Sequence, residues 1–228
     1  MIDIGKLYCD GTSTGDGLRY GTESKADAHG NAPHRVEKDA SQRRPIVVWN
    51  TTRTCNLKCV HCYTDSENRK YSNELTTKEA LKLIDELSDF GIPSLLFSGG
   101  EPFMREDLFK LLEYAARKNV RPVISTNGTL IDRETAQRVK DSGVVYVGIS
   151  LDGLESINDR FRGVEGAFTR TMKGFDNCRA VNQRVGLRLT LTKRNYEDLH
   201  GIFDFIEKEG INRACFYHLV YSGRGSSM

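Results

Sequence analysis

The sequence has no long apolar run. No stretch approaches the roughly 18 apolar residues that a membrane-spanning helix needs, and no apolar signal-peptide core follows the first residues. These absences argue against a membrane protein and against an exported one. We therefore expect no membrane partner and a cytoplasmic location, where thiols stay reduced.

The sequence also lacks an excess of charge of one sign. It carries 33 lysines and arginines against 31 aspartates and glutamates, which gives a net charge of +2. No long basic run stands out, as it does in many proteins that bind nucleic-acid phosphates. The charge pattern therefore gives no reason to expect a nucleic-acid partner.

Cysteine is scarce, with 6 residues in 228, but half of these cysteines stand together. Cys55, Cys59 and Cys62 form a Cys-x3-Cys-x2-Cys run, whereas the other three are scattered singly. In a reducing compartment such a cluster indicates metal binding or redox chemistry. Three thiolates can hold three irons of a four-iron cubane and leave the fourth iron open to a substrate or cofactor. A zinc site with His61 as the fourth ligand is the alternative.

Two regions differ in pattern. Residues 1–45 are rich in glycine and charge and show little apolar periodicity, which predicts an irregular N-terminal arm. From Pro45 onward, short apolar runs alternate with helical patterns. We therefore predict that residues 46–225 form one core domain.

The sequence of the core domain predicts strands that alternate with helices. Thr76 and Glu79 form a capping box that starts one helix, and Gly91 ends it; Asn195 is the predicted cap of the last helix. The predicted strands are 46–50, 94–98, 121–126, 144–150, 185–191 and a sixth within 213–220. Strands and helices in this order predict right-handed βαβ units and a parallel sheet. Six such units close only partly, so the prediction is an α/β fold, a partial (β/α)6 TIM-like barrel.

Polar clusters follow the first four predicted strands. They are the cysteine run, Gly99-Gly100-Glu101-Pro102, Ser125-Thr126-Asn127-Gly128 and Ser150-Leu151-Asp152-Gly153. Because the carboxyl ends of parallel strands meet at one rim, these clusters should lie together where such barrels build active sites.

In these motifs the chain resembles the radical S-adenosylmethionine (SAM) superfamily over roughly residues 46–225. The cysteine run matches the family's cluster loop, and Gly99-Gly100-Glu101-Pro102 matches its second-strand motif. The resemblance implies a [4Fe–4S] cluster held by Cys55, Cys59 and Cys62, with SAM on the open iron. The implied chemistry is one-electron cleavage of SAM to methionine and a 5′-deoxyadenosyl radical, which takes a hydrogen atom from the substrate.

The resemblance also implies which residues bind SAM. The set is Gly99, Gly100, Glu101, Asn127, Ser150, Asp152, Arg162 and Arg188. In this set the two glycines and Glu101 would hold the methionine amino group. Ser150 and Arg162 would bind its carboxylate, with Arg188 as a rival. The remaining two would meet the ribose or cap their own turns. No residue is identified as catalytic from the sequence.

Within the superfamily, residues 4–21, 48–53 and 216–225 resemble enzymes of haem d1 biosynthesis and of the siroheme-dependent haem pathway. The type that fits best removes acetate side chains from 12,18-didecarboxysiroheme and gives iron-coproporphyrin III. This implies a modified-haem substrate and an electron donor such as flavodoxin or ferredoxin. The candidate partners of the substrate are Arg19, Arg53, Arg160, Arg224, Tyr217 and His218. A peptide-modifying member of the superfamily and a metal-binding module without catalysis are the alternatives.

Members of this subgroup continue past the sixth strand into a cysteine-rich region that can hold an auxiliary cluster. This sequence stops at Met228, so we expect a core domain truncated after the sixth strand. The flank of that strand would then be uncovered, and part of the substrate pocket would be missing.

Overall fold

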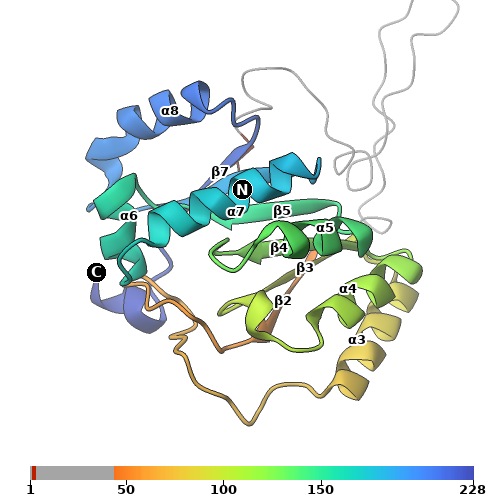
Figure 1. Cartoon of the computed structure of the whole chain (residues 1–228). Helices are drawn as coiled ribbons and strands as arrows, with labels where there is room; N and C mark the ends of the chain where they lie inside the picture. The colour runs from red at the N-terminus through yellow and green to blue at the C-terminus, as the bar shows by residue number, and fades with distance from the viewer. Residues whose placement is uncertain (1, 4–43) are drawn as a thin grey trace, which may run out of the picture.

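The computed structural model describes residues 2–3 and 44–228 and shows one curved sheet with helices along its outer face (Figure 1). The strand order is β1-β7-β6-β5-β4-β3-β2. Strands β2 to β7 run parallel, and β2 and β7 stand far apart in this order, so the barrel stays open. The predicted α/β fold with a partial six-stranded barrel is confirmed.

The strands are β1 (Ile2–Asp3), β2 (Val47–Thr52), β3 (Ser94–Gly99), β4 (Arg121–Thr126), β5 (Tyr146–Ser150), β6 (Val185–Leu191) and β7 (Ala214–His218). The helices are α3 (Thr77–Phe90), α4 (Leu108–Arg117), α5 (Arg133–Asp141), α6 (Glu155–Arg162), α7 (Ala167–Ala180) and α8 (Leu199–Lys208). Three short 3-10 helices are η2 (Pro102–Met104), η3 (Tyr196–Asp198) and η4 (Gly223–Ser227). None of the described helices is long and apolar enough to cross a membrane.

Local sequence signals position these elements as predicted. At the start of α3 the Thr76 side chain accepts a hydrogen bond from Glu79 N, and the Glu79 side chain accepts one from Thr76 N. The helix ends at Gly91, whose φ of +81° is the left-handed conformation that glycine adopts without strain. The capping box and the helix end are therefore confirmed.

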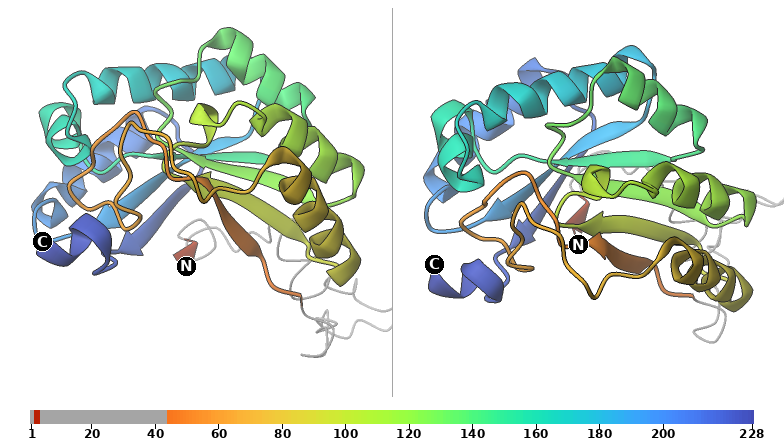
Figure 2. Two further views of the ribbon diagram at one scale, coloured as in Figure 1. Left: turned by 90° about the horizontal axis from the view of Figure 1, so that it is seen from below. Right: turned by 60° about the horizontal axis from the view of Figure 1, so that its bottom comes forward.

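The core lies between the sheet and the helices (Figure 2). Phe97 of β3, Ile124 of β4 and Ile149 of β5 are fully buried in it, as are Ile84 of α3 and Leu111 of α4. Alternate residues of each strand point to opposite faces, so the other set of strand side chains faces the inside of the barrel. That inner face carries the polar residues considered below.

The edge of β7 is paired, contrary to the expectation of an uncovered flank. Strand β1 runs antiparallel to β7, with Ile2 opposite Phe216 and Asp3 opposite Cys215. Two residues of the predicted N-terminal arm therefore extend the sheet. The rest of that arm, residue 1 and residues 4–43, lies outside the described residues, and so does Arg19.

Asn195 stands at the predicted position, but its side chain does not cap the helix. Its amide donates hydrogen bonds to Asp152 O and Thr190 O, both at 2.9 Å, and its oxygen accepts one from Thr192 N at 2.8 Å. Asn195 is fully buried. The prediction of a cap is wrong, because the side chain instead joins the end of β6 to the loop after β5.

Candidate active site at the carboxyl ends of the strands

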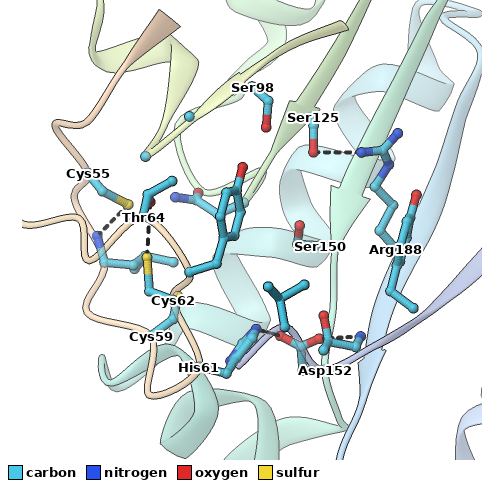
Figure 3. A pocket seen from close by; sticks show the side chains of 18 of the residues that line it. Cys55, Cys59, His61, Cys62, Thr64, Ser98, Ser125, Ser150, Asp152 and Arg188 are labelled. Carbon is cyan, nitrogen blue, oxygen red and sulfur yellow. Dashed lines mark hydrogen bonds and ion pairs between the residues drawn. The ribbon is translucent and has the colours of Figure 1, made fainter. Parts of the chain in front are cut away.

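A cavity of about 340 Å³ lies at the carboxyl ends of the strands (Figure 3). The strand residues that line it are Val48, Leu96, Ser98, Gly99, Ser125, Thr126, Ser150, Arg188, Thr190, Tyr217 and His218. From the loops come all three cysteines of the motif and Gly100, Asn127 and Asp152, and the last residue of α6, Arg162, also lines it. The structure thus brings together the predicted site residues at one rim, with Glu101 as the exception.

The loop that carries the three cysteines rests on the carboxyl end of α6. Lys58 N donates to Arg162 O at 3.1 Å, and Val60 N donates to Phe161 O at 2.9 Å. Gly163 follows the helix with a φ of +67°, and a Cβ at this position would overlap Lys58 O. A glycine is therefore required where the cysteine loop crosses the helix end.

Each cysteine sulfur has a hydrogen-bond partner. Cys55 accepts from Leu57 N at 3.4 Å, Cys59 from Arg162 Nη1 at 3.7 Å, and Cys62 from Ser66 N at 3.4 Å. Burial raises the pKa of Cys55 to about 12 and raises the pKa of Cys59, which Arg162 partly offsets. Burial also acts on Cys62, but hydrogen bonds from Thr64 and Ser66 outweigh it and lower its pKa. A metal bound to these sulfurs would keep them as thiolates.

This donor set fits a cluster with three thiolate ligands. The alternative of a zinc ion needs His61 as a fourth ligand, but His61 Nε2 lies 3.1 Å from Asp152 Oδ2. Figure 3 shows the His61 ring turned toward Asp152. Within the part of the chain that the structure describes, no three His, Cys, Asp or Glu side chains form a site for a single metal ion.

Gly99 and Gly100 bring the end of β3 against the strand that precedes the cysteines. Gly100 N donates to Thr52 O at 2.7 Å. A Cβ on Gly100 would lie 2.5 Å from Thr54 O and 2.6 Å from Arg53 O, which are backbone atoms that cannot move aside cheaply. Both glycines line the cavity, so a ligand can approach their backbone closely.

Glu101 holds two strand ends together. Its fully buried carboxylate accepts hydrogen bonds from Asn127 N at 2.8 Å, Thr126 Oγ1 at 2.7 Å and Phe103 N at 3.2 Å. Burial raises its pKa to about 7 against the effect of these three bonds. Its carboxylate thus joins β3 to β4, and its predicted contact with the methionine amino group stays a prediction.

Asp152 is the centre of a buried ionic group. Its Oδ2 lies 2.6 Å from Arg162 Nη2 and 3.1 Å from His61 Nε2, and its Oδ1 accepts from Thr190 N at 2.8 Å. Burial raises the pKa of Asp152, but Arg162 and His61 outweigh it and lower the pKa to about 2. Because Arg162 also contacts Cys59, this group links the end of β5 to the cysteine loop. The expected ribose contact of Asp152 stays a prediction.

Asn127 joins the end of β4 to the same loop. Its amide donates to Asn56 Oδ1 at 2.9 Å, and its oxygen accepts from Thr129 N at 2.9 Å and Thr129 Oγ1 at 2.7 Å. The side chain caps its own turn, which is one of the two roles expected for it. Its ribose contact is untested and stays a prediction.

Ser150 and Arg188 are opposite each other in the register of β5 and β6. Both side chains line the cavity. The guanidinium of Arg188 does not lie beside Ser150, although the backbones of the two residues are paired. It reaches across to β4, where its Nη1 donates to Ser125 Oγ at 2.8 Å. Arg188 Cζ lies 5.7 Å from the centre of the Tyr217 ring. The two residues thus offer a hydroxyl and a guanidinium at different depths of one wall.

The arginines expected at the substrate have other contacts. Arg53 stacks on the Tyr71 ring at 4.9 Å and makes an ion pair with Asp65 at 3.6 Å. Arg160 is exposed and donates to Ser156. Arg224 binds backbone carbonyls of the cysteine loop, while Tyr217 and His218 line the cavity.

Several functional positions carried no motif in the sequence. Ser98 and Thr190 line the cavity although they stand within strands rather than in motifs after them, and Ser125 lines it from the polar cluster that ends β4. The available signal was the alternation of polar and buried residues, as in β4, where every second residue is buried. Asn56 and Thr129, which bond to Asn127, carried no such signal.

Comparison with known proteins gives one family and a consistent group of relatives. A sequence model of the radical SAM superfamily matches residues 49–206. Fe-coproporphyrin III synthase of Methanosarcina barkeri is 52% identical over 228 residues, which is 100% of this chain and 56% of the relative. Pre-heme d1 synthase of Dinoroseobacter shibae is 42% identical over 183 residues, 80% of this chain and 45% of the relative.

The fold has solved counterparts. The structure described as native anSMEcpe with bound AdoMet and a Cp18Cys peptide superposes with a TM-score of 0.66 at 21% identity, covering 77% of this chain and 50% of that one. This likeness concerns the fold alone. The chain spans about half the length of the curated relatives it matches.

Proposed function

Because this chain belongs to the radical SAM superfamily, we propose that it is the catalytic core of an enzyme that modifies a tetrapyrrole in haem or haem d1 biosynthesis. The observation that carries the proposal is 52% identity to Fe-coproporphyrin III synthase along the whole chain. In its most specific form, the reaction is removal of acetate side chains from 12,18-didecarboxysiroheme to give iron-coproporphyrin III.

The site residues divide into a cluster loop and a cofactor wall. Cys55, Cys59 and Cys62 would hold a [4Fe–4S] cluster. When bound, the cluster and SAM supply a 5′-deoxyadenosyl radical that can remove an unactivated hydrogen atom. Gly100 lines the cavity without a side chain, so the methionine group could approach its backbone, and Ser150 offers a hydroxyl to the same cavity.

Arg162 is proposed to bind the carboxylate of SAM together with Ser150. Its guanidinium lines the cavity beside Cys59, one of the three residues that would hold the cluster, and its Nε is buried without a hydrogen bond among the described residues. Asp152 fixes the orientation of this guanidinium. The same ion pair keeps the charge of Arg162 largely compensated before a ligand binds.

The electron donor and the location belong to the same proposal. Reduction of the cluster needs a one-electron donor such as flavodoxin or ferredoxin. A reducing cytoplasm suits the five described cysteines, all of which are free thiols.

The proposal is tested with the anaerobically purified chain after cluster reconstitution. Reduced protein is incubated with SAM and 12,18-didecarboxysiroheme, and the tetrapyrrole is followed by mass spectrometry, with Cys59→Ala as the inactive control. We expect 5′-deoxyadenosine together with loss of acetate side chains. Formation of 5′-deoxyadenosine without any change in the tetrapyrrole would reject the substrate. A colourless, iron-free protein after reconstitution would reject the radical chemistry itself.

A further inference from the structure

Among the described residues that line the cavity, one arginine has no counter-charge. Asp152 is the acidic side chain among these residues, and Arg162 already compensates it. Arg224 is paired with Asp65 at 2.8 Å. Arg188 makes no ion pair with any described residue, and its Nε is buried without a hydrogen bond. Arg188 is half-buried, and a cation without a counter-charge in such a place favours a ligand that brings a negative charge.

The chain is shaped to hold this guanidinium in place. Arg188 Nη1 donates to Ser125 Oγ at 2.8 Å, and Arg188 Cζ lies 5.7 Å from the centre of the Tyr217 ring. Gly148 makes the space, because a Cβ there would overlap Arg188 Nε and lie 2.9 Å from Arg188 Cδ. Any side chain at position 148 would therefore displace the charge.

The strand register sets the depth of the group. Gly148 is opposite Ser125, whereas Ser150 is opposite Arg188. The guanidinium crosses Gly148 to reach Ser125, so it lies one layer of side chains below Ser150, toward the amino ends of the strands. Figure 3 shows it on the far side of the cavity from Cys55 and Cys62, turned toward Ser125.

We propose that Arg188, with Ser125, binds a carboxylate side chain of the substrate on the wall of the barrel below Ser150. This inference rests on the proposed function, whose substrate carries carboxylates. It assigns Arg188 to the substrate rather than to the carboxylate of SAM. Arg162 is beside the cysteine loop and Arg188 is across the cavity from it, so the two arginines bind different ligands.

The test compares the binding of three ligands to matched variants of the reconstituted chain. The probes are iron-coproporphyrin III, its fully esterified form and SAM. Arg188→Gln removes the charge, and Gly148→Ala displaces it without removing it. Arg184→Gln, an exposed arginine just before the same strand, is the control. Iron content and circular dichroism report whether each variant folds, and Arg188→Met replaces Arg188→Gln if that variant fails.

We expect Arg188→Gln and Gly148→Ala to weaken binding of the free acid by about tenfold or more, as for loss of a charged hydrogen bond. Binding of the ester and of SAM should stay unchanged. Weaker binding of SAM with unchanged porphyrin binding would overturn the inference and assign Arg188 to the cofactor. Equal binding of the free acid by variant and wild type would overturn it as well. Failure of the wild type to bind any of the porphyrins would instead reject the proposed substrate, and this inference with it.

Discussion

Arg224 Nε donates a hydrogen bond to the backbone carbonyl of Cys59 at 2.8 Å, across 165 positions of sequence. The same guanidinium donates to Ser66 O at 3.0 Å, and Arg224 N donates to Cys62 O at 2.9 Å. Figure 2 shows the result, with the C-terminal helix η4 lying against the loop that follows β2. The last described turn of the chain therefore fixes the backbone of two of the three cysteines.

Arg224→Ala should loosen the cysteine loop. A hydrogen bond from a charged donor to a backbone carbonyl contributes about 2 kcal/mol to stability, and the substitution removes such bonds from the loop. We expect lower iron retention after desalting and faster bleaching in air, measured by iron analysis and visible absorbance. Arg160→Ala is the control, because Arg160 is exposed and its hydrogen bond among the described residues goes to Ser156 of its own helix. Equal iron retention in both variants would show that η4 does not hold the loop.

Gly100→Ala should disrupt the junction of β2 and β3. The added methyl would lie 2.5 Å from Thr54 O and 2.6 Å from Arg53 O, and overpacking against backbone costs about 2 kcal/mol or more. Gly201→Ala is a matched control within α8, where the nearest atom is 3.9 Å away. A helical glycine replaced by alanine should gain about 0.5–1 kcal/mol. Urea unfolding midpoints that move in the same direction for both variants would contradict this account.

Glu101→Gln should change how stability depends on pH. Burial raises the pKa of Glu101 from 4.5 to about 7, because the folded state favours the neutral carboxyl. The stability that this preference gives is fully present below about pH 4.5 and is lost as the pH rises through about 7. The free energy of unfolding of the wild type should therefore fall relative to Glu101→Gln by roughly 3 kcal/mol between pH 5 and pH 8. Urea unfolding at both pH values measures the difference, and a gap that widens in favour of the wild type would refute it.

Cys59→Ala should abolish cluster assembly, while Cys178→Ala should leave it intact. Cys178 is fully buried in the core, and burial raises its pKa to about 12, so it remains a neutral thiol that packs as a small apolar group. Its loss should cost about 1 kcal/mol of stability without changing the iron content. Iron and sulfide analysis of both reconstituted variants decides the matter, and equal iron content would refute the assignment of the cluster loop.

The fold could be predicted from the sequence because its signals are local. The bounds of β4 and β6 match the predicted runs, and the capping box at Thr76 is built from residues three positions apart. Each of these signals uses periodicity or turn chemistry within a few residues. Such signals are reliable because residues that are close in the sequence also contact each other in the folded protein.

The contacts within the site could not be predicted in the same way. Asn195 and Glu101 have side chains of the types that cap helices or bind ligands. Each is fully buried and makes hydrogen bonds to another strand or loop. Arg224, expected at the substrate, lines the cavity and also binds the backbone of Cys59, a contact that no local signal predicts. A polar side chain takes whichever partner the tertiary fold brings to it, and residue type alone does not contain that information.

Asp152 and Arg162 offer the sharpest energetic test of the site. Both side chains are buried, and their charged groups lie 2.6 Å apart. Removing one partner of such a pair leaves an uncompensated buried charge, at a cost of about 3–5 kcal/mol, whereas removing both leaves none. We expect Asp152→Asn and Arg162→Met each to be strongly destabilising. The double variant should be much less destabilised than the sum of the two, and urea unfolding of all four proteins gives this coupling energy. Additive effects would mean that the pair does not act as a unit, and Arg162 would then need another partner to hold it beside Cys59.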